Sequence, residues 1–305
     1  MKRLLYVLTA VVLISACGQS YEEKRRISHK KRQQMMREDS AALKVAVMPT
    51  LDCLPLFVAK DIHLFDSLKV DVRLKAFTAQ MDCDTALAGG SVQGAVTDLV
   101  RAERLISKGT PLQYVSSTNT YWQLYSNRNA RIRTLKQLDD KMVGMTRYSA
   151  TDLLADFVRD SAKIDREKLF KIQVNDVHIR LKMLLNSEID AVWLTEPQAT
   201  QAKMGRQHLL LDSRRIPVQL GVIAFRGKDL KDEGRQKQLE LFRKGYNIAC
   251  DSLARFGIGH YLSIAEKHLK LRANEVDSLP KNIKFTHLTE PDSANVERAR
   301  KWLKQ

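Results

Sequence analysis

The sequence has no apolar run long enough to cross a membrane. The longest, Leu4–Ile14, has about 11 residues, whereas a membrane-spanning helix needs about 20. The sequence also has no H-E-x-x-H pair and no G-x-S-x-G turn, so it carries neither the zinc-protease nor the serine-hydrolase signature. Its 7 histidines are scattered singly, and its 4 cysteines have no metal-ligand spacing. We therefore expect no catalytic residues, no resident metal and no cofactor.

Acidic residues are outnumbered by basic ones. The chain has 35 Asp and Glu against 51 Lys and Arg, a formal net charge of +16. Such a charge can indicate nucleic-acid binding. Here, however, the basic residues are spread along the chain without interleaved aromatic residues on which bases could stack. We predict no nucleic-acid partner, and a basic surface that faces anionic lipid or a membrane partner is the better interpretation.

The amino terminus has the pattern of a signal peptide. Lys2 and Arg3 precede the apolar run, which ends in Ile14-Ser15-Ala16-Cys17. This ending resembles a bacterial lipobox, in which small residues admit the signal peptidase and the cysteine receives the lipid. We predict a lipoprotein signal peptide over residues 1–16 and lipidation of Cys17, which would anchor the mature protein to a membrane of the cell envelope, on the extracytoplasmic or periplasmic side. The alternatives are an ordinary secretory signal and a buried cysteine.

Residues 17–42 are predicted to form a tether. The basic clusters Lys24-Arg25-Arg26 and Lys30-Lys31-Arg32 dominate this segment, which has no proline and no clear apolar period. Too little apolar surface is available to order it against a core. A solvated spacer or a frayed helix is expected, and attraction to anionic lipid headgroups is the alternative.

From Leu43 onward, short apolar strands alternate with helical patterns, which predicts an α/β fold. The first strands end in Thr50 and in Thr97-Asp98. Ligands of open α/β sheets bind at the carboxyl ends of parallel strands, so these ends are a candidate site. A second unit repeats the pattern after residue 121, with Thr195-Glu196 at a matching strand end. The two units would then present equivalent edges to one cleft, although chance recurrence of such strand ends is the alternative.

Small polar, acidic and aromatic residues near these strand ends are the candidate ligand-binding residues. They are Thr50, Asp52, Thr97, Asp98, Trp122, Tyr148, Ser149, Ala150 and Glu196. The acids favour an amine-bearing ligand or a cationic heterocycle over an anion, and the aromatics could stack on a planar or cationic ligand. The helix start at Ser149 offers free N–H groups to a polar oxygen. Each acid could instead be a cap or a surface residue, and Ser149 a simple N-cap. Trp193 is expected in the core.

The order of these segments resembles the solute-binding proteins of bacterial ABC importers, in the group that includes thiamine-precursor, sulfonate or taurine, and nitrate binders. The resemblance covers about Leu43 to Lys304. It includes the opening strand and turn, the segment LLNSEIDAVWLTEPQAT, the strand in IPVQLGVIAFRG and the carboxyl-terminal helices. It implies a two-lobed, type II periplasmic-binding-protein-like α/β fold with two hinge crossovers and a ligand cleft between the lobes. Lobe 1 would comprise residues 43–118 and 222–305, and lobe 2 residues 119–221.

The resemblance also implies a function. The chain would be a monomeric lipoprotein that captures a small molecule between its lobes and delivers it to an ABC permease. A ligand-binding or sensing lipoprotein without a transporter is the runner-up. An enzyme is the third possibility, since some proteins of this fold synthesise pyrimidines with a cysteine-rich iron site. It ranks last because nothing in this sequence reproduces that cysteine cluster.

The cysteines suggest a covalent link. Cys53 lies in the turn after the first strand and Cys83 in the turn after the second, so neighbouring parallel strands would bring the two turns together. We predict a Cys53–Cys83 disulfide, which would contribute roughly 3–4 kcal/mol, and a buried position for Cys250 on an apolar helical stripe. The alternative is a metal site that combines Cys53 and Cys83 with the neighbouring aspartates and His63, although the spacing fits no established ligand signature.

Overall fold

The computed structural model describes residues 21–305, which fall into two units divided after Ala42. The predicted signal peptide and Cys17 lie outside the described residues. In the first unit, α2 (Tyr21–Ala41) is a continuous helix whose residues from Arg25 onward are almost all exposed. Within residues 21–305, no helix is both long and apolar enough to cross a bilayer.

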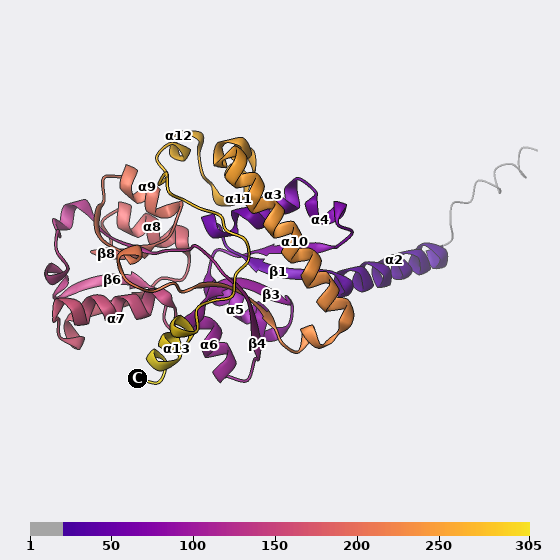
Figure 1. The fold of residues 1–305 in the computed structure, drawn as a ribbon, viewed down its shortest axis with the longest axis horizontal. Helices are drawn as coiled ribbons and strands as arrows, with labels where there is room; N and C mark the ends of the chain where they lie inside the picture. Colours follow the sequence, from indigo (N-terminus) through magenta and orange to yellow (C-terminus); the bar gives the residue numbers. More distant parts are fainter. Residues whose placement is uncertain (1–20) are drawn as a thin grey trace, which may run out of the picture. The chain divides into compact units, whose positions relative to one another are not determined.

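The second unit, Leu43–Gln305, is a two-lobed α/β fold built on two five-stranded sheets (Figure 1). The first sheet, in lobe 1, has the order β2-β1-β3-β10-β4, and the second, in lobe 2, has the order β7-β6-β8-β5-β9. The strands are β1 (Leu43–Val47), β2 (Val72–Ala76), β3 (Gly94–Asp98), β4 (Leu112–Ser117), β5 (Gln123–Ser126), β6 (Lys141–Met145), β7 (Leu169–Gln173), β8 (Ala191–Leu194), β9 (His208–Asp212) and β10 (Gly221–Arg226).

Helices separate most consecutive strands and cover the sheets. They are α3 (Leu54–Asp61), α4 (Leu64–Ser67), α5 (Gln80–Gly89), α6 (Leu99–Ser107), α7 (Ala150–Ala162), α8 (Val177–Leu185), α9 (Gln198–Met204), α10 (Glu233–Phe256), α11 (Leu262–Leu269), α12 (Ala273–Val276) and α13 (Ser293–Trp302). Several begin at an aspartate or serine whose side chain accepts a backbone N–H of the first turn, as helix N-termini require.

The two sheets repeat one arrangement. In lobe 1, β1 pairs in parallel with β2 and β3, and β10 pairs antiparallel with β3. In lobe 2, β6 pairs in parallel with β7 and β8, and β5 pairs antiparallel with β8. β3 and β8 therefore occupy the same central position in their sheets. All residues of β3 and β8 are buried, as expected of strands covered on both faces.

Two segments carry the chain between the lobes. The first connects β4 to β5 and the second connects β9 to β10. These are the two crossovers expected of the fold. After α12, the carboxyl-terminal segment, residues 277–292, runs without regular structure to α13. Helix α13 packs on α6 (Figure 1). Trp302 of α13 donates from Nε1 to Asp156 Oδ2 of α7 at 3.0 Å, so α13 contacts both lobes.

The predicted Cys53–Cys83 disulfide is wrong for this structure. Both residues are buried free thiols, as is Cys250. Cys83 does not lie in a turn after β2 but inside α5, a helix that we did not predict. The Cys53 sulfur instead accepts the Met48 N–H at 3.4 Å. Burial raises the pKa of the Cys83 thiol to about 12, which keeps it protonated and unreactive at neutral pH.

Candidate functional site

The two lobes are in direct contact around a central cavity. The contacts are hydrogen bonds that each join one residue of lobe 1 to one residue of lobe 2. They include Leu51 N to Glu196 O (2.8 Å), Gln198 Nε2 to Pro49 O (3.0 Å), Ala150 N to Asp98 Oδ1 (3.0 Å) and Val177 N to Thr78 O (3.2 Å). An isolated antiparallel bridge also joins Ala79 to Asp176. The cleft is therefore closed over the cavity.

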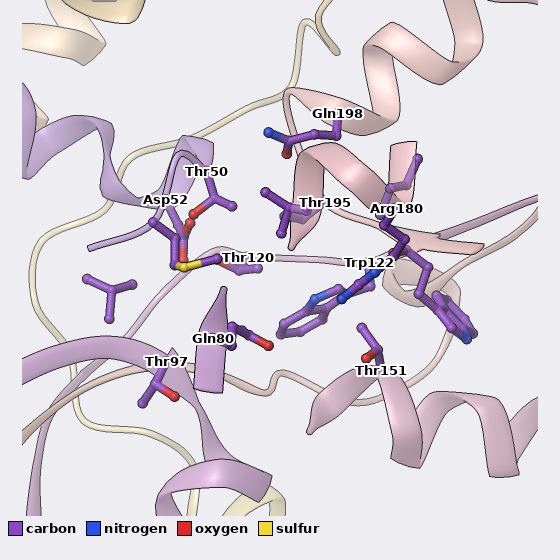
Figure 2. Close-up of a pocket in the computed structure, with 15 residues that line it drawn as sticks. Thr50, Asp52, Gln80, Thr97, Thr120, Trp122, Thr151, Arg180, Thr195 and Gln198 are labelled. Carbon is purple, nitrogen blue, oxygen red and sulfur yellow. The ribbon is translucent and has the colours of Figure 1, made fainter. Parts of the chain in front are cut away.

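Both lobes line this cavity, which has a volume of about 540 Å³ including the part open to solvent. Figure 2 shows lobe 1 residues on one side and lobe 2 residues on the other, with Trp122 of the first crossover between them. The polar and aromatic lining residues labelled there are Thr50, Asp52, Gln80, Thr97, Thr120, Trp122, Thr151, Arg180, Thr195 and Gln198.

Three polar atoms of the cavity lining are buried without a hydrogen-bond partner. They are Asp52 Oδ1, Gln198 Oε1 and Trp193 Nε1. Buried polar atoms are normally paired, and each unpaired one costs about 1–3 kcal/mol. Two of these atoms are acceptors and one is a donor, so a bound molecule with complementary groups would satisfy them.

A buried cation lies at the lobe 2 side of the cavity. Arg180 of α8 is 4% exposed and donates to Val174 O, to Trp193 O and to Thr146 Oγ1. No carboxylate is within ion-pairing distance of it in the described structure, and burial lowers the pKa of its guanidinium to about 10. Its charge favours an acceptor or an anionic group in this half of the cavity.

Asp98 does not line the cavity. It is the N-cap of α6, and its Oδ1 accepts both the Arg101 N–H and the Ala150 N–H of α7, each at 3.0 Å. One carboxylate oxygen therefore caps helices of both lobes, while Oδ2 is buried without a partner. Arg101 pairs with Asp84. Burial, opposed by the Arg101 charge, raises the pKa of Asp98 to about 7.

The turn before α7 is occupied by its own hydrogen bonds. The Ser149 hydroxyl donates to Thr146 O at 2.7 Å and accepts the Thr151 N–H, so Ser149 acts as an N-cap. The Ala150 N–H donates to Asp98 and the Thr151 N–H donates to Ser149, so neither N–H group is free to bind an external anion. Tyr148 is 47% exposed, and its ring lies under the Arg104 guanidinium, 4.2 Å from the ring centroid.

Glu196 lies beside the cavity rather than in it. Its Oε1 accepts the Tyr121 hydroxyl at 3.1 Å and its Oε2 accepts the Thr200 N–H at 3.0 Å. Burial raises the pKa of its carboxyl group above the ordinary value, against the lowering effect of these hydrogen bonds. Glu196 lines an adjoining cavity.

The structure thus brings four of the nine predicted residues to the cavity, namely Thr50, Asp52, Thr97 and Trp122. Asp98, Tyr148, Ser149, Ala150 and Glu196 lie around it. Trp193 is fully buried, as expected of a core residue, yet it also lines the cavity. Sequence reasoning missed Arg180, Gln80 and Gln198, because isolated Arg or Gln residues near helix starts carry no pattern that separates them from surface residues.

The described residues offer no metal centre. In the part of the chain from residue 21 onward, no group of three or more His, Cys, Asp or Glu side chains is arranged to hold an ion. The polar atoms of the cavity are spread over its two sides, an arrangement that suits an organic molecule with polar groups at both ends.

Comparison with known proteins places the chain in a family. The family model described as NMT1/THI5 like matches residues 50–262, a range that contains most of the cavity. The chain belongs to the NMT1/THI5-like family. No curated protein sequence matches this NMT1/THI5-like chain.

Solved structures share the fold of this NMT1/THI5-like protein. The alkanesulfonate-binding protein SsuA of Xanthomonas axonopodis pv. citri, bound to MOPS, has a TM-score of 0.74 at 16% identity, covering 86% of this chain and 91% of its own. A zinc-bound ligand-binding component of an ABC-type import system from Staphylococcus aureus gives 0.72 at 19% identity, with 87% and 91% covered. The nitrate-binding protein NrtA of Synechocystis PCC 6803 gives 0.69 at 15% identity, with 84% and 74% covered. These likenesses confirm the two-lobed binding-protein fold.

Proposed function

We propose that this protein is a membrane-anchored, extracytoplasmic solute-binding lipoprotein that captures a small molecule between its lobes and delivers it to an ABC permease. Lobe 1 would comprise residues 43–118 and 222–305, and lobe 2 residues 119–221. The observation that carries the proposal is the closed cavity between the lobes, which is lined from both sides and has three unpaired buried polar atoms. A ligand that contacts both lobes favours the closed form, because only that form offers all of its contacts.

The lining suggests the chemistry of the ligand. Asp52 Oδ1 and Gln198 Oε1 are unpaired acceptors, which suit a ligand N–H group and above all a protonated amine. Trp193 Nε1 is an unpaired donor, and the backbone carbonyl of Trp193 accepts from Arg180. We therefore assign the ligand an amine or a cationic heterocycle at the Asp52 end and a hydrogen-bond acceptor at the Trp193 end. The indole of Trp122 is available to stack on a planar group.

The amino-terminal segment would supply the anchor. Lipidation of Cys17 would hold the protein on the membrane, and the segment that joins Cys17 to the lobes contains α2, which is roughly 30 Å long at about 1.5 Å of rise per residue. The basic residues of α2 would favour an anionic membrane surface. So would the excess of Lys and Arg over Asp and Glu that remains once Lys2 and Arg3 are removed with the signal peptide, 51 − 2 = 49 against 35. Mass measurement of the protein extracted from membranes would test acylation, and Cys17→Ala should release the protein into the soluble fraction.

A ligand screen tests the binding function. Thermal shift against amines, pyrimidines and sulfonates should identify a stabilising compound that contains an N–H donor. Asp52→Asn should weaken its binding by about tenfold or more, because a hydrogen bond to a charged group contributes about 1.5–3 kcal/mol. The matched control Asp165→Asn, at a residue whose side chain is 80% exposed, should leave binding unchanged. Equal affinities of the wild type and the Asp52 variant would refute the assignment of the amine end.

Two other functions would give different results. A sensing lipoprotein without a transporter would bind the ligand equally well, but no permease and ATPase would be encoded beside its gene. An enzyme would convert the bound compound, whereas a binding protein returns it unchanged. Chromatography of the ligand after prolonged incubation with the protein separates these cases.

A further inference from the structure

A second cavity adjoins the first. It has a volume of about 430 Å³ including its open part, and it shares the lining residues Asp52, Thr120 and Thr195 with the first cavity. Sharing three lining residues makes the two cavities neighbouring compartments of one cleft. The first compartment is the cavity described above, and the second is this adjoining one.

The carboxyl-terminal segment forms one wall of the second compartment. Residues Ile283 to Thr286 line it together with residues of the first crossover. Asn119 of that crossover donates from Nδ2 to Lys284 O at 2.8 Å and to Thr286 Oγ1 at 3.2 Å. This wall is therefore fixed to the crossover by hydrogen bonds.

The two compartments differ in chemistry. The first contains the unpaired donor of Trp193 and the unpaired acceptor of Gln198. The described residues that line the second include no buried polar side-chain atom without a partner except Asp52 Oδ1, which both compartments share. Apolar and aromatic side chains contribute much of its wall. They are Leu51, Tyr121, Tyr246, Ile283 and Phe285.

Three charged residues line the second compartment, namely Asp52 at the junction, Glu196, and Lys284, which is exposed. Of these, Glu196 is already paired. Both carboxylate oxygens of Glu196 accept hydrogen bonds, from the Tyr121 hydroxyl and from the Thr200 N–H. The Arg214 guanidinium lies over the Tyr121 ring, 3.9 Å from its centroid. An occupant of the second compartment therefore gains by burying apolar surface against these side chains.

From these observations, and resting on the proposed function, we infer that the protein binds an elongated amine. Its polar, planar head occupies the first compartment, its nitrogen donates to Asp52 at the junction, and a short alkyl or aryl substituent fills the second compartment. The second compartment then determines which members of a series of amines are bound tightly.

Two matched probes test this inference. N-methyl-(pyridin-3-ylmethyl)amine presents a planar head, a ring acceptor and a protonated amine, and its N-butyl analogue adds only an apolar tail. Isothermal titration calorimetry with the intact protein should show the N-butyl compound binding at least tenfold more tightly. Thr286→Trp, which fills the second compartment, should remove that advantage and leave the N-methyl affinity within about twofold of the wild type.

The control is Thr289→Trp, the same replacement three residues further along, at a residue that lines neither compartment. It should keep the full advantage of the butyl group. If circular dichroism shows that Thr286→Trp is unfolded, Phe285→Ala is used in its place. This variant should reduce the affinity difference between the two probes, because it removes an aromatic side chain from the wall of the second compartment.

Each remaining outcome decides a different point. Equal affinities of the two probes for the wild type would show that the second compartment does not bind the apolar tail. The proposed binding function would not be affected by that result. If folded Thr286→Trp still binds the N-butyl probe more tightly by the same factor as the wild type, the tail lies elsewhere and the inference is wrong. Absence of saturable binding by both probes would overturn the amine assignment on which the inference rests.

Discussion

Asp98 is expected to make the stability of the protein depend on pH in an unusual direction. Its carboxyl group is fully buried, one oxygen is unpaired, and its pKa in the folded protein is raised to about 7, against an unfolded value of about 3.9. Between these two values the folded state binds a proton that the unfolded state does not. The free energy of unfolding therefore falls as pH rises through this window.

The magnitude follows from the pKa difference. Each pH unit within the window changes the free energy of unfolding by about 1.4 kcal/mol, so raising the pH from 5 to 7 should cost on the order of 2–3 kcal/mol. In Asp98→Asn the side-chain oxygen still accepts the N–H groups of Arg101 and Ala150, which lie at 3.0 Å in the wild type, but the titration is gone. The variant should lose much less stability than the wild type over the same interval.

Urea unfolding at pH 5, 6, 7 and 8, followed by circular dichroism, gives the comparison. Other buried acids such as Asp84 and Glu196, whose pKa values are also raised by burial, contribute to both proteins. The difference between the two pH profiles therefore isolates Asp98. Parallel profiles would show that the Arg101 charge keeps Asp98 ionised throughout, and the pH dependence assigned to Asp98 would then be wrong.

Three further predictions concern the carboxyl terminus, the thiols and the tether. Trp302→Phe should lower the free energy of unfolding by about 1 kcal/mol in chemical denaturation, because it removes the hydrogen bond to Asp156 and leaves the ring packing in place. Alkylation of the denatured protein without a reductant should modify all described cysteines, and a mass deficit of two labels would reveal a disulfide. Those cysteines are Cys53, Cys83 and Cys250. Deletion of residues 18–41 should leave the melting temperature of the lobes within about 2 °C, because the chain divides into separate units after Ala42.

Much of the fold could be predicted from the sequence, because its buried strands are short apolar runs that end in polar residues. β3 and β8 show this most clearly, since each is fully buried and a polar residue at its end lines the cavity, Thr97 within β3 and Thr195 directly after β8. Helix α5 was missed because its sequence, QMDCDTALAG, has almost no apolar period. That omission also led to the wrong disulfide, since it placed Cys83 in a turn.

The site could be predicted only in part, for a physical reason. The ends of the strands locate a cleft, but they do not show which polar atoms have no hydrogen-bond partner in the folded protein. Asp98 and Glu196 looked like ligand contacts, and yet their carboxylates are used by helix N–H groups and by Tyr121. Arg180 looked like an ordinary basic residue, and its burial follows from backbone carbonyls that only the tertiary structure brings to it.

Native mass spectrometry shows directly whether the cavity between the lobes holds one small molecule. The purified protein is incubated with an extract of small metabolites and then freed of unbound compounds. We predict one adduct of constant mass per chain. A variant that combines Asp52→Asn with Trp122→Ala should lose this adduct, and Asp165→Asn should keep it. Absence of an adduct on the wild type, or the same adduct on the cavity variant, would show that this cavity is not the binding site.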